Sequence, residues 1–300
     1  MSRVACIGEC MVELSLPPEV VGESRLGFAG DTANVAIYLR RAAGPAVEVA
    51  YVTGLGDDRL SDAMAEFLAG HGLSTGLIER RAGKAPGLYA ISLDGKGERS
   101  FTYWRDASAA RTLFDPAQTV TFDRLRDFDI LYLSGISLAV LSPKARADLR
   151  AFLAEYRAAG GRVAFDSNYR PRLWPDADTA RAEIGALWRL TDIALPSVDD
   201  EMALWGDADA PAVLARILDA GARQGALKRG AEGPLAIGWE GALPPFPAET
   251  RVVDTTAAGD SFNGAFLAAL IAGAPPPDCL LAGHMQAARV IRFPGAIIPE

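Results

Sequence analysis

The stretch Asp254-Thr-Thr-Ala-Ala-Gly-Asp-Ser-Phe262 decides the fold, and it leads directly into an apolar, helix-like segment at 264–274. A helix start leaves backbone N–H groups unpaired and partly positive, so it attracts phosphate oxygens. The small residues Ala257, Ala258 and Gly259 leave room for such an approach. Asp260 would then lie in the first turn as an ionised carboxylate that can accept a proton. An anion cradle beside a base predicts phosphoryl transfer to a hydroxyl, although Asp also fits a simple helix cap.

The composition indicates a soluble enzyme. Three hundred residues with 50% hydrophobic content can bury one large core, with at most a small appendage. The net charge of −8, without a run of Lys or Arg, argues against nucleic acid and against an anionic membrane surface as partners. The chain passes from Met1 straight into a strand-like run without signal-peptide architecture, and its longest apolar stretch is too short to span a bilayer. We therefore expect a cytoplasmic protein.

Cysteine and histidine offer little chemistry. Cys6, Cys10 and Cys279 are odd in number and lack metal-ligand spacing, so reduced thiols in the cytoplasm are expected. His71 and His284 are too few for a histidine-based triad or a zinc site, and we expect them to be surface or packing residues.

Strand-like and helix-like segments alternate along most of the chain. The strand-like segments are 4–8, 47–54, 129–134, 163–167, 193–196 and 235–239. The helix-like segments are 31–41, 60–69, 144–159, 179–190 and two that close the chain. This alternation predicts an α/β fold with a mostly parallel sheet flanked by helices on both faces.

One region interrupts the alternation. Segments 88–93 and 98–105 read as two strands joined by the turn Asp94-Gly-Lys-Gly97, and segments 11–16 and 25–28 could pair with them. An antiparallel flap on a parallel body suggests a lid that closes over a substrate and excludes water. An ordinary edge hairpin is the alternative.

Two segments offer groups for a polar ligand. Gly30-Asp31-Thr32-Ala33-Asn34 turns into a helix, and Asp31 and Asn34 are spaced to bind sugar hydroxyls, or merely to cap that helix. In the flap, strand alternation puts Tyr103 and Arg105 on one face and Trp104 on the other. With Tyr89, they would suit a ligand that carries a carboxylate, although an aromatic cluster with a surface Arg fits equally well.

Two further segments follow strand-like runs. Asp166-Ser-Asn-Tyr-Arg-Pro171 lies at the carboxyl end of a strand, the edge where ligands bind in open α/β sheets, which makes Arg170 a candidate. Lys228-Arg-Gly-Ala-Glu-Gly233 could wrap phosphates, or form a plain turn. The chain contains no Gly-x-x-x-x-Gly-Lys-Ser/Thr, so it is not a P-loop enzyme.

Together these motifs resemble the ribokinase-like (PfkB) carbohydrate kinases, whose C-terminal signature reads Asp-Thr-x-Gly-Ala-Gly-Asp. Ala257 stands where most of the family has Gly, a departure seen mainly in the branch that acts on keto-deoxy sugar acids. The resemblance spans essentially the whole chain. It implies one kinase domain of residues 1–300, with a small β-strand lid formed by approximately 10–29 and 87–106. It also implies a sugar acid and ATP as substrates and Mg²⁺ as cofactor, and leaves a monovalent-cation requirement open.

The resemblance also assigns roles to individual residues. Asp260 is the implied catalytic base, and Ala257, Ala258 and Gly259 supply the anion hole. The implied sugar-binding residues are Gly30, Asp31, Asn34, Tyr89, Tyr103, Arg105 and Arg170. The implied ATP-binding residues are Asn168, Ser197, Lys228, Gly230 and Gly233. In the family's Asn-x-x-Glu element Ser197 replaces Asn, and either Asp200 or Glu201 takes the Glu role, so metal ligands stay unassigned.

The two arginines favour an acid sugar as substrate. A neutral sugar would leave Arg105 and Arg170 as unpaired cations in a closed site, unless each forms a salt bridge with one of the 38 acidic residues. A fructokinase or another neutral-sugar kinase is the main alternative, followed by a non-catalytic sugar- or nucleotide-binding protein. A dehydrogenase is poorly supported, because no Gly-x-Gly-x-x-Gly follows the first strand. The edge of the flap would suit a homo-oligomer.

Overall fold

The computed structural model describes residues 2–17, 22–93, 99–115 and 120–300, and it contains two β-sheets. In spatial order, the larger sheet consists of β12 (Leu235–Ile237), β11 (Gln224–Leu227), β10 (Ile193–Ala194), β9 (Arg162–Asp166), β8 (Ile130–Ser134), β1 (Ser2–Ile7), β4 (Val47–Gly56) and β5 (Ile78–Arg81). Every neighbouring pair in it is parallel except β11 with β12. The predicted α/β fold with a mostly parallel sheet is confirmed.

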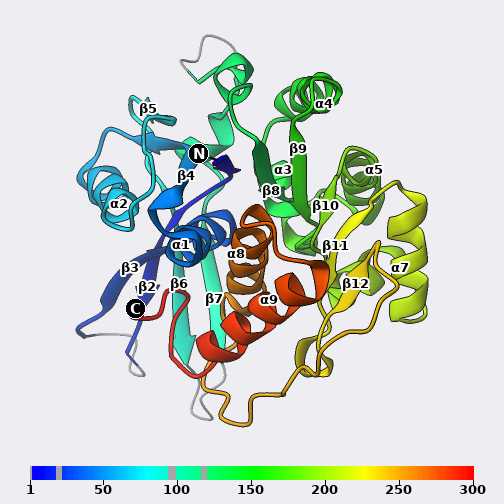
Figure 1. Cartoon of the computed structure of the whole chain (residues 1–300). Helices are drawn as coiled ribbons and strands as arrows, with labels where there is room; N and C mark the ends of the chain where they lie inside the picture. The colour runs from blue at the N-terminus through cyan, green and yellow to red at the C-terminus, as the bar shows by residue number, and fades with distance from the viewer. Residues whose placement is uncertain (1, 18–21, 94–98, 116–119) are drawn as a thin grey trace.

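Helices cover both faces of this sheet (Figure 1). One face carries α1 (Asp31–Ala43), α2 (Arg59–Gly70), α8 (Ala258–Ile271) and α9 (Pro276–Val290). The other carries α3 (Gly135–Val140), α4 (Pro143–Ala158), α5 (Ala177–Trp188), α6 (Val198–Trp205) and α7 (Ala210–Asp219). Short 3₁₀ helices lie at η1 (Gly44–Ala46), η2 (Ala109–Thr112), η3 (Phe122–Leu125), η4 (Pro171–Leu173) and η5 (Gly230–Glu232).

The central strands are apolar throughout because both of their faces are buried. In β1, Ala5 and Ile7 belong to one core and Val4 and Cys6 to the other. The sheet therefore lies between two apolar cores. The polar residues that follow its parallel strands lie at the edge formed by the carboxyl ends of those strands.

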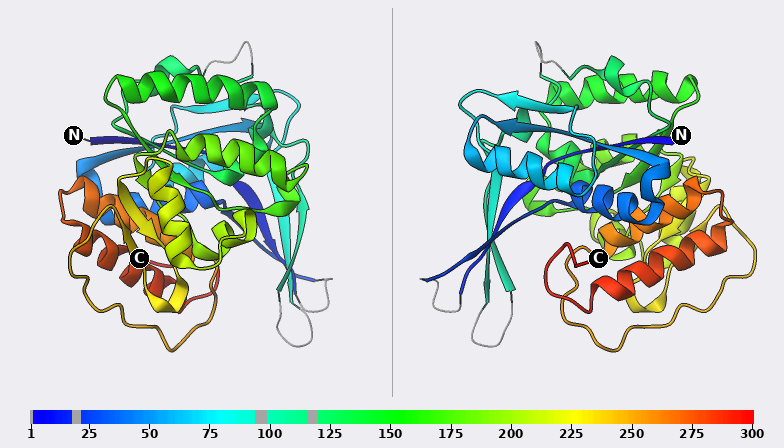
Figure 2. Two further views of the ribbon diagram at one scale, coloured as in Figure 1. Left: turned by 90° about the vertical axis from the view of Figure 1, so that its right-hand side faces the viewer. Right: turned by 60° about the vertical axis from the view of Figure 1, so that its left-hand side comes forward.

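A second sheet stands out from the body of the molecule (Figure 2). Its strands, in spatial order, are β3 (Arg25–Ala29), β2 (Met11–Ser15), β6 (Gly87–Leu93) and β7 (Arg99–Trp104). β2 pairs with β6 in parallel, and the two outer pairs are antiparallel. The strands predicted for the flap are found, whereas the turn predicted at Asp94–Gly97 lies outside the described residues.

Several local predictions need correction, because helices α3, α6 and α7 and strand β5 were not predicted and β10 is shorter than expected. The strand predicted at 193–196 contains only Ile193–Ala194, because Pro196 has no N–H to donate to a ladder. Helix α3 follows β8 immediately and was not predicted, since six residues are too few for a helical repeat to show. A capping box between Ser134 and Ser137 starts it.

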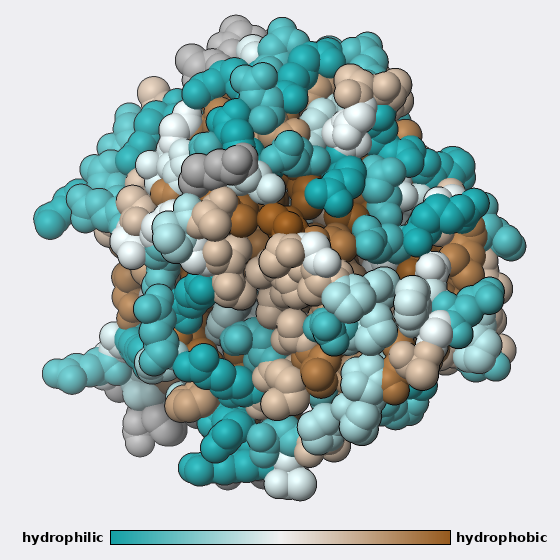
Figure 3. All heavy atoms as spheres, viewed as in Figure 1, coloured by the Kyte–Doolittle hydropathy of each residue, from teal (hydrophilic) through white to brown (hydrophobic). Residues whose placement is uncertain are grey.

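Helices α1 and α8 pack closely against each other. A Cβ on Gly264 would lie 2.7 Å from the backbone nitrogen of Leu39, so only glycine permits this approach. Apolar side chains gather over this part of the face in Figure 3, around a groove of about 630 Å³ lined largely by alanines of α1, α8 and α9. None of the described helices combines the length and apolar composition that crossing a membrane requires.

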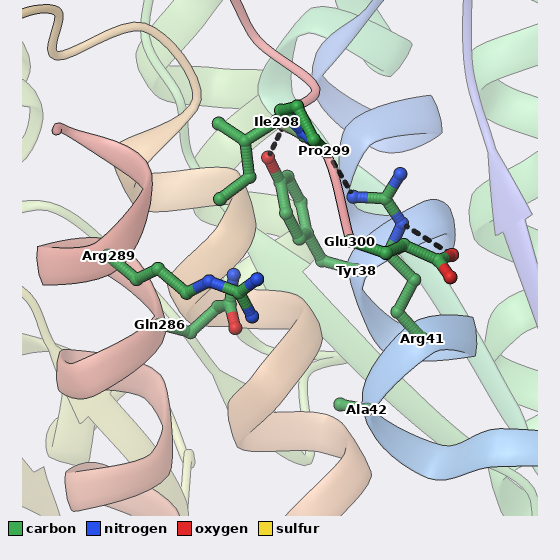
Figure 4. A pocket seen from close by; sticks show the side chains of 8 residues that line it. All are labelled: Tyr38, Arg41, Ala42, Gln286, Arg289, Ile298, Pro299 and Glu300. Carbon is green, nitrogen blue, oxygen red and sulfur yellow. Dashed lines mark hydrogen bonds and ion pairs between the residues drawn. The ribbon is translucent and has the colours of Figure 1, made fainter. Parts of the chain in front are cut away.

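The segment after α9 is bound to α1. Tyr38 donates its hydroxyl hydrogen to the Ala296 carbonyl at 2.7 Å. Arg41 donates to the Ile298 carbonyl at 2.7 Å (Figure 4). Gly295 N–H donates to Asp254 at 2.6 Å. This segment therefore links α1 to the loop that precedes α8.

Candidate active site

The helix starts of α1 and α8 bring the predicted base to the predicted sugar-binding residues. Asn34 donates its amide N–H to Asp260 at 2.8 Å. Gly30 precedes α1, and a Cβ there would lie 2.2 Å from the Glu9 carbonyl oxygen, so glycine is required. Residues 226 positions apart in the chain thus share one hydrogen bond.

Two carboxylates at this point perturb each other. Burial and the charge of Asp31 raise the pKa of Asp260 to about 7. Burial also raises the pKa of Asp31, although hydrogen bonds from Ser134 and Asn168 oppose the shift. A general base works best when its pKa is near the working pH, so Asp260 is suited to accept a proton at neutral pH.

Asp31 is held by residues that follow two neighbouring strands. Ser134, at the end of β8, donates to its Oδ2 at 2.5 Å, and Asn168, just after β9, donates to the same oxygen at 2.9 Å. Asn168 has a positive φ of 32°, a conformation that is unusual outside glycine and recurs at functional sites. The motifs predicted Asn168 as an ATP residue but did not indicate Ser134, whose signal was a capping serine at the end of an apolar strand.

Lys228 directly follows β11, and its buried side chain reaches the start of α8. Its ammonium donates to Asp166 at 2.5 Å and to the side-chain oxygen of Asn263 at 3.0 Å. Asn263 in turn donates to Asp166 and to the Tyr132 hydroxyl. A Cβ placed on Gly259 would lie 3.6 Å from the Lys228 ammonium. The predicted phosphate lysine therefore puts a fixed positive charge beside the predicted anion hole.

The loop before α8 explains the family preference for glycine. Ala257 adopts the left-handed conformation, with φ 59° and ψ 15°, which favours glycine. No side chain caps the helix, and the first N–H groups of a helix have no intrahelical partners. The Ala258 N–H donates to the Thr255 carbonyl at 3.2 Å. In the part of the chain that the structure describes, this leaves the N–H groups of Gly259 and Asp260 for a ligand. Asp254 accepts hydrogen bonds from the N–H and hydroxyl of Thr256, and so holds the loop in shape.

Two adjoining cavities meet at this helix start. A cavity of about 250 Å³ is lined by carboxylates of Asp31, Asp166, Asp200 and Asp260. Another of about 230 Å³ is lined by Gly230, Phe262 and His284, among others. Both include Ser197, Lys228, Ala258 and Gly259 in their walls. Within the described ranges, no group of three or more His, Cys, Asp or Glu side chains is arranged to hold a metal ion.

The structure separates the two candidates for the family's glutamate. Asp200 faces the carboxylate-lined cavity, and burial raises its pKa. Glu201 is buried on another side, where Arg216 donates to it at 2.8 Å. Of the two residues, Asp200 therefore lines the cavity and Glu201 does not.

The glycines of the predicted phosphate turn differ in what they contact. Gly230 lines the smaller cavity. Gly233 has φ 77°, and a Cβ there would lie 2.6 Å from Phe246, so it serves the turn and its packing.

The second sheet brings aromatic residues toward the loop before α8. Tyr89 is buried in a cluster with Met11, Ile91 and Ala296 that packs against Ala257, and its hydroxyl donates to Glu13. Tyr103, opposite Tyr89 on β7, is 46% exposed, with its ring 5.8 Å from that of Tyr89. Glu13 was missed, because one acidic residue in a strand pattern carries no distinctive signal.

Both predicted carboxylate-binding arginines have acidic partners. Arg105 lies past the end of β7 and forms a buried ion pair with Glu9. Arg170 donates to Asp200 at 2.9 Å. The expectation that a neutral sugar would leave both cations unpaired is therefore wrong, and the alternative of salt bridges is what the structure contains.

Comparisons with known proteins agree with this geometry. The profile of the pfkB family carbohydrate kinases matches residues 1–300. The chain is 44% identical to 2-dehydro-3-deoxygluconokinase of Escherichia coli strain K12 over 305 residues, which cover 99% of this chain and 97% of the relative. It is 30% identical to Fructokinase-1 of Zea mays over 256 residues, which cover 81% of this chain and 73% of the relative.

A solved structure shows the same fold. It is an Escherichia coli protein provisionally named ribokinase II, in complex with ATP and Mg²⁺. It superimposes with a TM-score of 0.84 at 25% identity, over 99% of this chain and 94% of that protein. The expected ribokinase-like fold is confirmed, and the chain belongs to the pfkB family of carbohydrate kinases.

Proposed function

We propose that this protein transfers the γ-phosphoryl group of ATP to the terminal 6-hydroxyl of 2-keto-3-deoxy-D-gluconate, with Asp260 as general base. The observation that carries the proposal is the position of Asp260. It lies in the first turn of α8, is held by Asn34, and has a pKa raised to about 7. The name of the 44% identical relative supports the choice of sugar acid.

The residues at the start of α8 fit a nucleotide's phosphates. The uncapped first turn offers N–H groups, and Lys228 adds a positive charge on the wall shared by both cavities. Ser197 and Gly230, which line the smaller cavity, are proposed to contact ATP, with its base toward His284. For Asn168, which lines the other cavity, and for Gly233, the proposal rests on the family resemblance. The oxygen donors Asp166 and Asp200 suit Mg²⁺, which would neutralise phosphate charge when bound.

Asp260 takes the proton of the attacking hydroxyl. Asn34 fixes the orientation of the Asp260 carboxylate. Ser134 and Asn168 both donate to one oxygen of Asp31, so its remaining lone pairs can accept hydrogen bonds from sugar hydroxyls. The backbone N–H groups of the anion hole, Ala257–Gly259, and the Lys228 ammonium stabilise the charge on the transferring group.

The second sheet is proposed to act as the lid, with Tyr89 and Tyr103 facing the sugar. Closure would exclude water from the transfer. Arg105 would contact the substrate carboxylate from the lid side, and Arg170 from the strand-end side. These assignments rest on the family resemblance and on the position of the sheet over the Ala257 loop.

A neutral-sugar kinase such as a fructokinase is the second candidate. The specific observation in its favour is that Glu9 and Asp200 already neutralise the two arginines. Asp260 and the anion hole would keep their roles in such an enzyme.

ADP release with Mg-ATP tests both candidates. The panel contains 2-keto-3-deoxygluconate, 2-keto-3-deoxygalactonate, fructose and ribose. We expect turnover on the keto-deoxy acids. Preference for fructose would establish the second candidate, and lack of turnover on all four would refute the kinase proposal for these sugars.

We also propose that the protein works in the cytoplasm as a homo-oligomer. The three cysteines are unpaired and buried, as suits a reducing compartment. Outer strands β3 and β7 of the second sheet present edges that could pair with another copy. Light scattering tests the assembly, and the same ADP assay with K⁺ or Na⁺ tests for a monovalent cation.

A further inference from the structure

The second sheet joins the body of the molecule where Glu9, Gly30, Gly87 and Arg105 meet, here called the hinge cluster. Each of these residues lies at the junction of a second-sheet strand with the rest of the chain: before β2, after β3, at the start of β6 and after β7. The packing is tight. A Cβ on Gly87 would lie 2.7 Å from Glu9 Oε1 and 3.1 Å from Arg105 Cβ. Any movement of the second sheet must therefore pass through these contacts.

The charges in the hinge cluster are buried and only partly satisfied. Glu9 is 1% and Arg105 6% exposed, and one Arg105 nitrogen, Nη2, donates to Glu9 Oε2. The other carboxylate oxygen of Glu9 and the Nε of Arg105 are buried and have no hydrogen-bond partner among the residues that the structure describes. A guanidinium can offer a carboxylate two parallel hydrogen bonds, and this pair uses a single one. Arg105 therefore retains donor capacity for a second carboxylate.

Arg105 also acts on the proposed sugar site. Gly30 of the hinge cluster, whose added Cβ would lie 2.2 Å from the Glu9 carbonyl oxygen, directly precedes Asp31. The positive charge of Arg105 also lowers the pKa of Asp31, against the larger effect of burial. Asp31 lines the cavity that contains Asp260. The hinge cluster therefore adjoins, through Gly30 and Asp31, the cavity where a substrate carboxylate would arrive.

We infer that Glu9 is a specificity-determining residue that neutralises Arg105 until the carboxylate of a sugar acid replaces it. This inference rests on the proposed function. The carboxylate of a sugar acid can form both parallel hydrogen bonds with Arg105, of which Glu9 forms only one, whereas a neutral sugar brings no anion and leaves Glu9 in place. Selectivity then arises because only one class of sugar can displace the resident partner. The Glu9–Arg105 pair lies in the hinge cluster. Replacement of Glu9 by the substrate carboxylate therefore also changes the contacts that join the second sheet to the rest of the molecule.

The variant E9Q tests the exchange, with E79Q as matched control. Buried Glu79 forms an ion pair with partly buried Arg81 at 2.5 Å, on β5. We would measure the Kd of 2-keto-3-deoxygluconate and of fructose by calorimetry without ATP, together with thermal unfolding midpoints. Both variants should unfold at lower temperature than the wild type, because each leaves an arginine that is at least partly buried without its counter-ion.

The two variants should differ in ligand binding. E9Q should bind the acid about fivefold tighter or more, since Arg105 no longer has a resident competitor, while its Kd for fructose stays unchanged. E79Q should bind both ligands as the wild type does. An unchanged or weaker affinity of E9Q for the acid would overturn the inference and make Glu9 a structural counter-ion.

A second variant covers a failure of E9Q to fold. E9D keeps the charge on a shorter side chain, so its pair with Arg105 is weaker, and it should bind the acid tighter than the wild type does, by less than E9Q. Equal or weaker binding overturns the inference. Wild-type protein that neither binds nor phosphorylates the acid would instead refute the proposed function, and the inference with it.

Discussion

The α1–α8 wall of the active-site cavity and the second sheet are held in different ways. On the α1–α8 side, each chemical group is fixed by named partners: Asp260 by Asn34, Asp31 by Ser134 and Asn168, and Lys228 by Asp166 and Asn263. On the second sheet, Tyr103 and Trp104 are 46% and 59% exposed, and the Arg105–Glu9 pair leaves buried polar atoms unmatched.

This difference separates chemistry from recognition. Groups that stabilise developing charge work best when they are already oriented, because no reorganisation is needed during the reaction. Groups that recognise a substrate gain selectivity when they are held by a partner that only the correct substrate can replace. The α1–α8 wall therefore suits the first task, and the second sheet with its hinge cluster suits the second.

Removing the base should give the largest effect on the α1–α8 side. We expect D260N to lower kcat by about 10²–10⁴, the usual scale for a positioned general base, while binding of the sugar acid is largely kept. Steady-state ADP release and calorimetry would measure the two quantities. D278N, an Asp in the first turn of α9, is the matched control and should leave kcat unchanged. Near wild-type turnover of D260N would remove Asp260 from the mechanism.

Removing the fixed cation should come next. K228M should lower kcat by about 10²–10³, as losing one preorganised charge-stabilising group does. It also leaves Asp166 buried without its cation, which should lower the free energy of unfolding by about 3–5 kcal/mol. Turnover per folded molecule and urea unfolding measure these effects.

Two controls separate charge from stability at Lys228. K144M, at an exposed pair with Asp148, should leave both quantities unchanged. The double variant K228M/D166N should regain stability, while its turnover should stay low because it lacks both the cation and a proposed ligand of Mg²⁺. Recovery of both together would reduce Lys228 to a structural role.

On the second sheet, the expected effect is on binding rather than on chemistry. R105A should raise the KM for the sugar acid about 10- to 100-fold, the loss expected for hydrogen bonds to a charged group. The KM for ATP should stay nearly unchanged. Separate titrations of the two substrates would measure this split, and equal effects on both would argue against carboxylate recognition by Arg105.

The pH dependence tests the coupling between Asp31 and Asp260. The base must be ionised to act, so kcat/KM should fall as the pH drops through about 7, the raised pKa of Asp260. D31N removes the neighbouring negative charge and so lowers the pKa of Asp260. The fall of kcat/KM on the acidic side should therefore shift to lower pH, independently of the effect of D31N on the absolute rate. A limb that stays in place would show that Asp31 does not set the pKa of the base.

The smallest effect should come from the strained loop. A257G should raise the free energy of unfolding by about 0.5–1 kcal/mol, because glycine adopts the left-handed conformation without strain. A258G, one residue later inside α8, should lower it by about 1 kcal/mol, the usual cost of glycine in a helix. Urea unfolding measures the change in the free energy of unfolding for each variant. A change in the same direction for both would contradict this account of the loop.

Local patterns predicted most of the fold because they repeat along the chain. Apolar runs gave β1, β4, β8 and β9, and helical spacing gave α1, α2, α4 and α5, within a few residues of their observed ends. Helix α3 was not predicted, and strand β10 was predicted too long. Both elements are shorter than the stretch that a hydrophobic repeat needs in order to be recognised. The helix starts that carry Gly30, Asp31, Asn34 and Asp260 were predicted because helix starts have a recognisable composition.

The sequence by itself determined the order of the elements, the helix start that carries Asp260 and the family to which the chain belongs, because each of these is written in consecutive residues. Only the tertiary structure decided which charges meet. It paired Arg105 with Glu9 across 96 positions, Lys228 with Asp166 across 62, and assigned Asp200 rather than Glu201 to the cavity. The physical reason is that an ion pair depends on distance and burial in space, and neither is encoded in the spacing of residues along the chain.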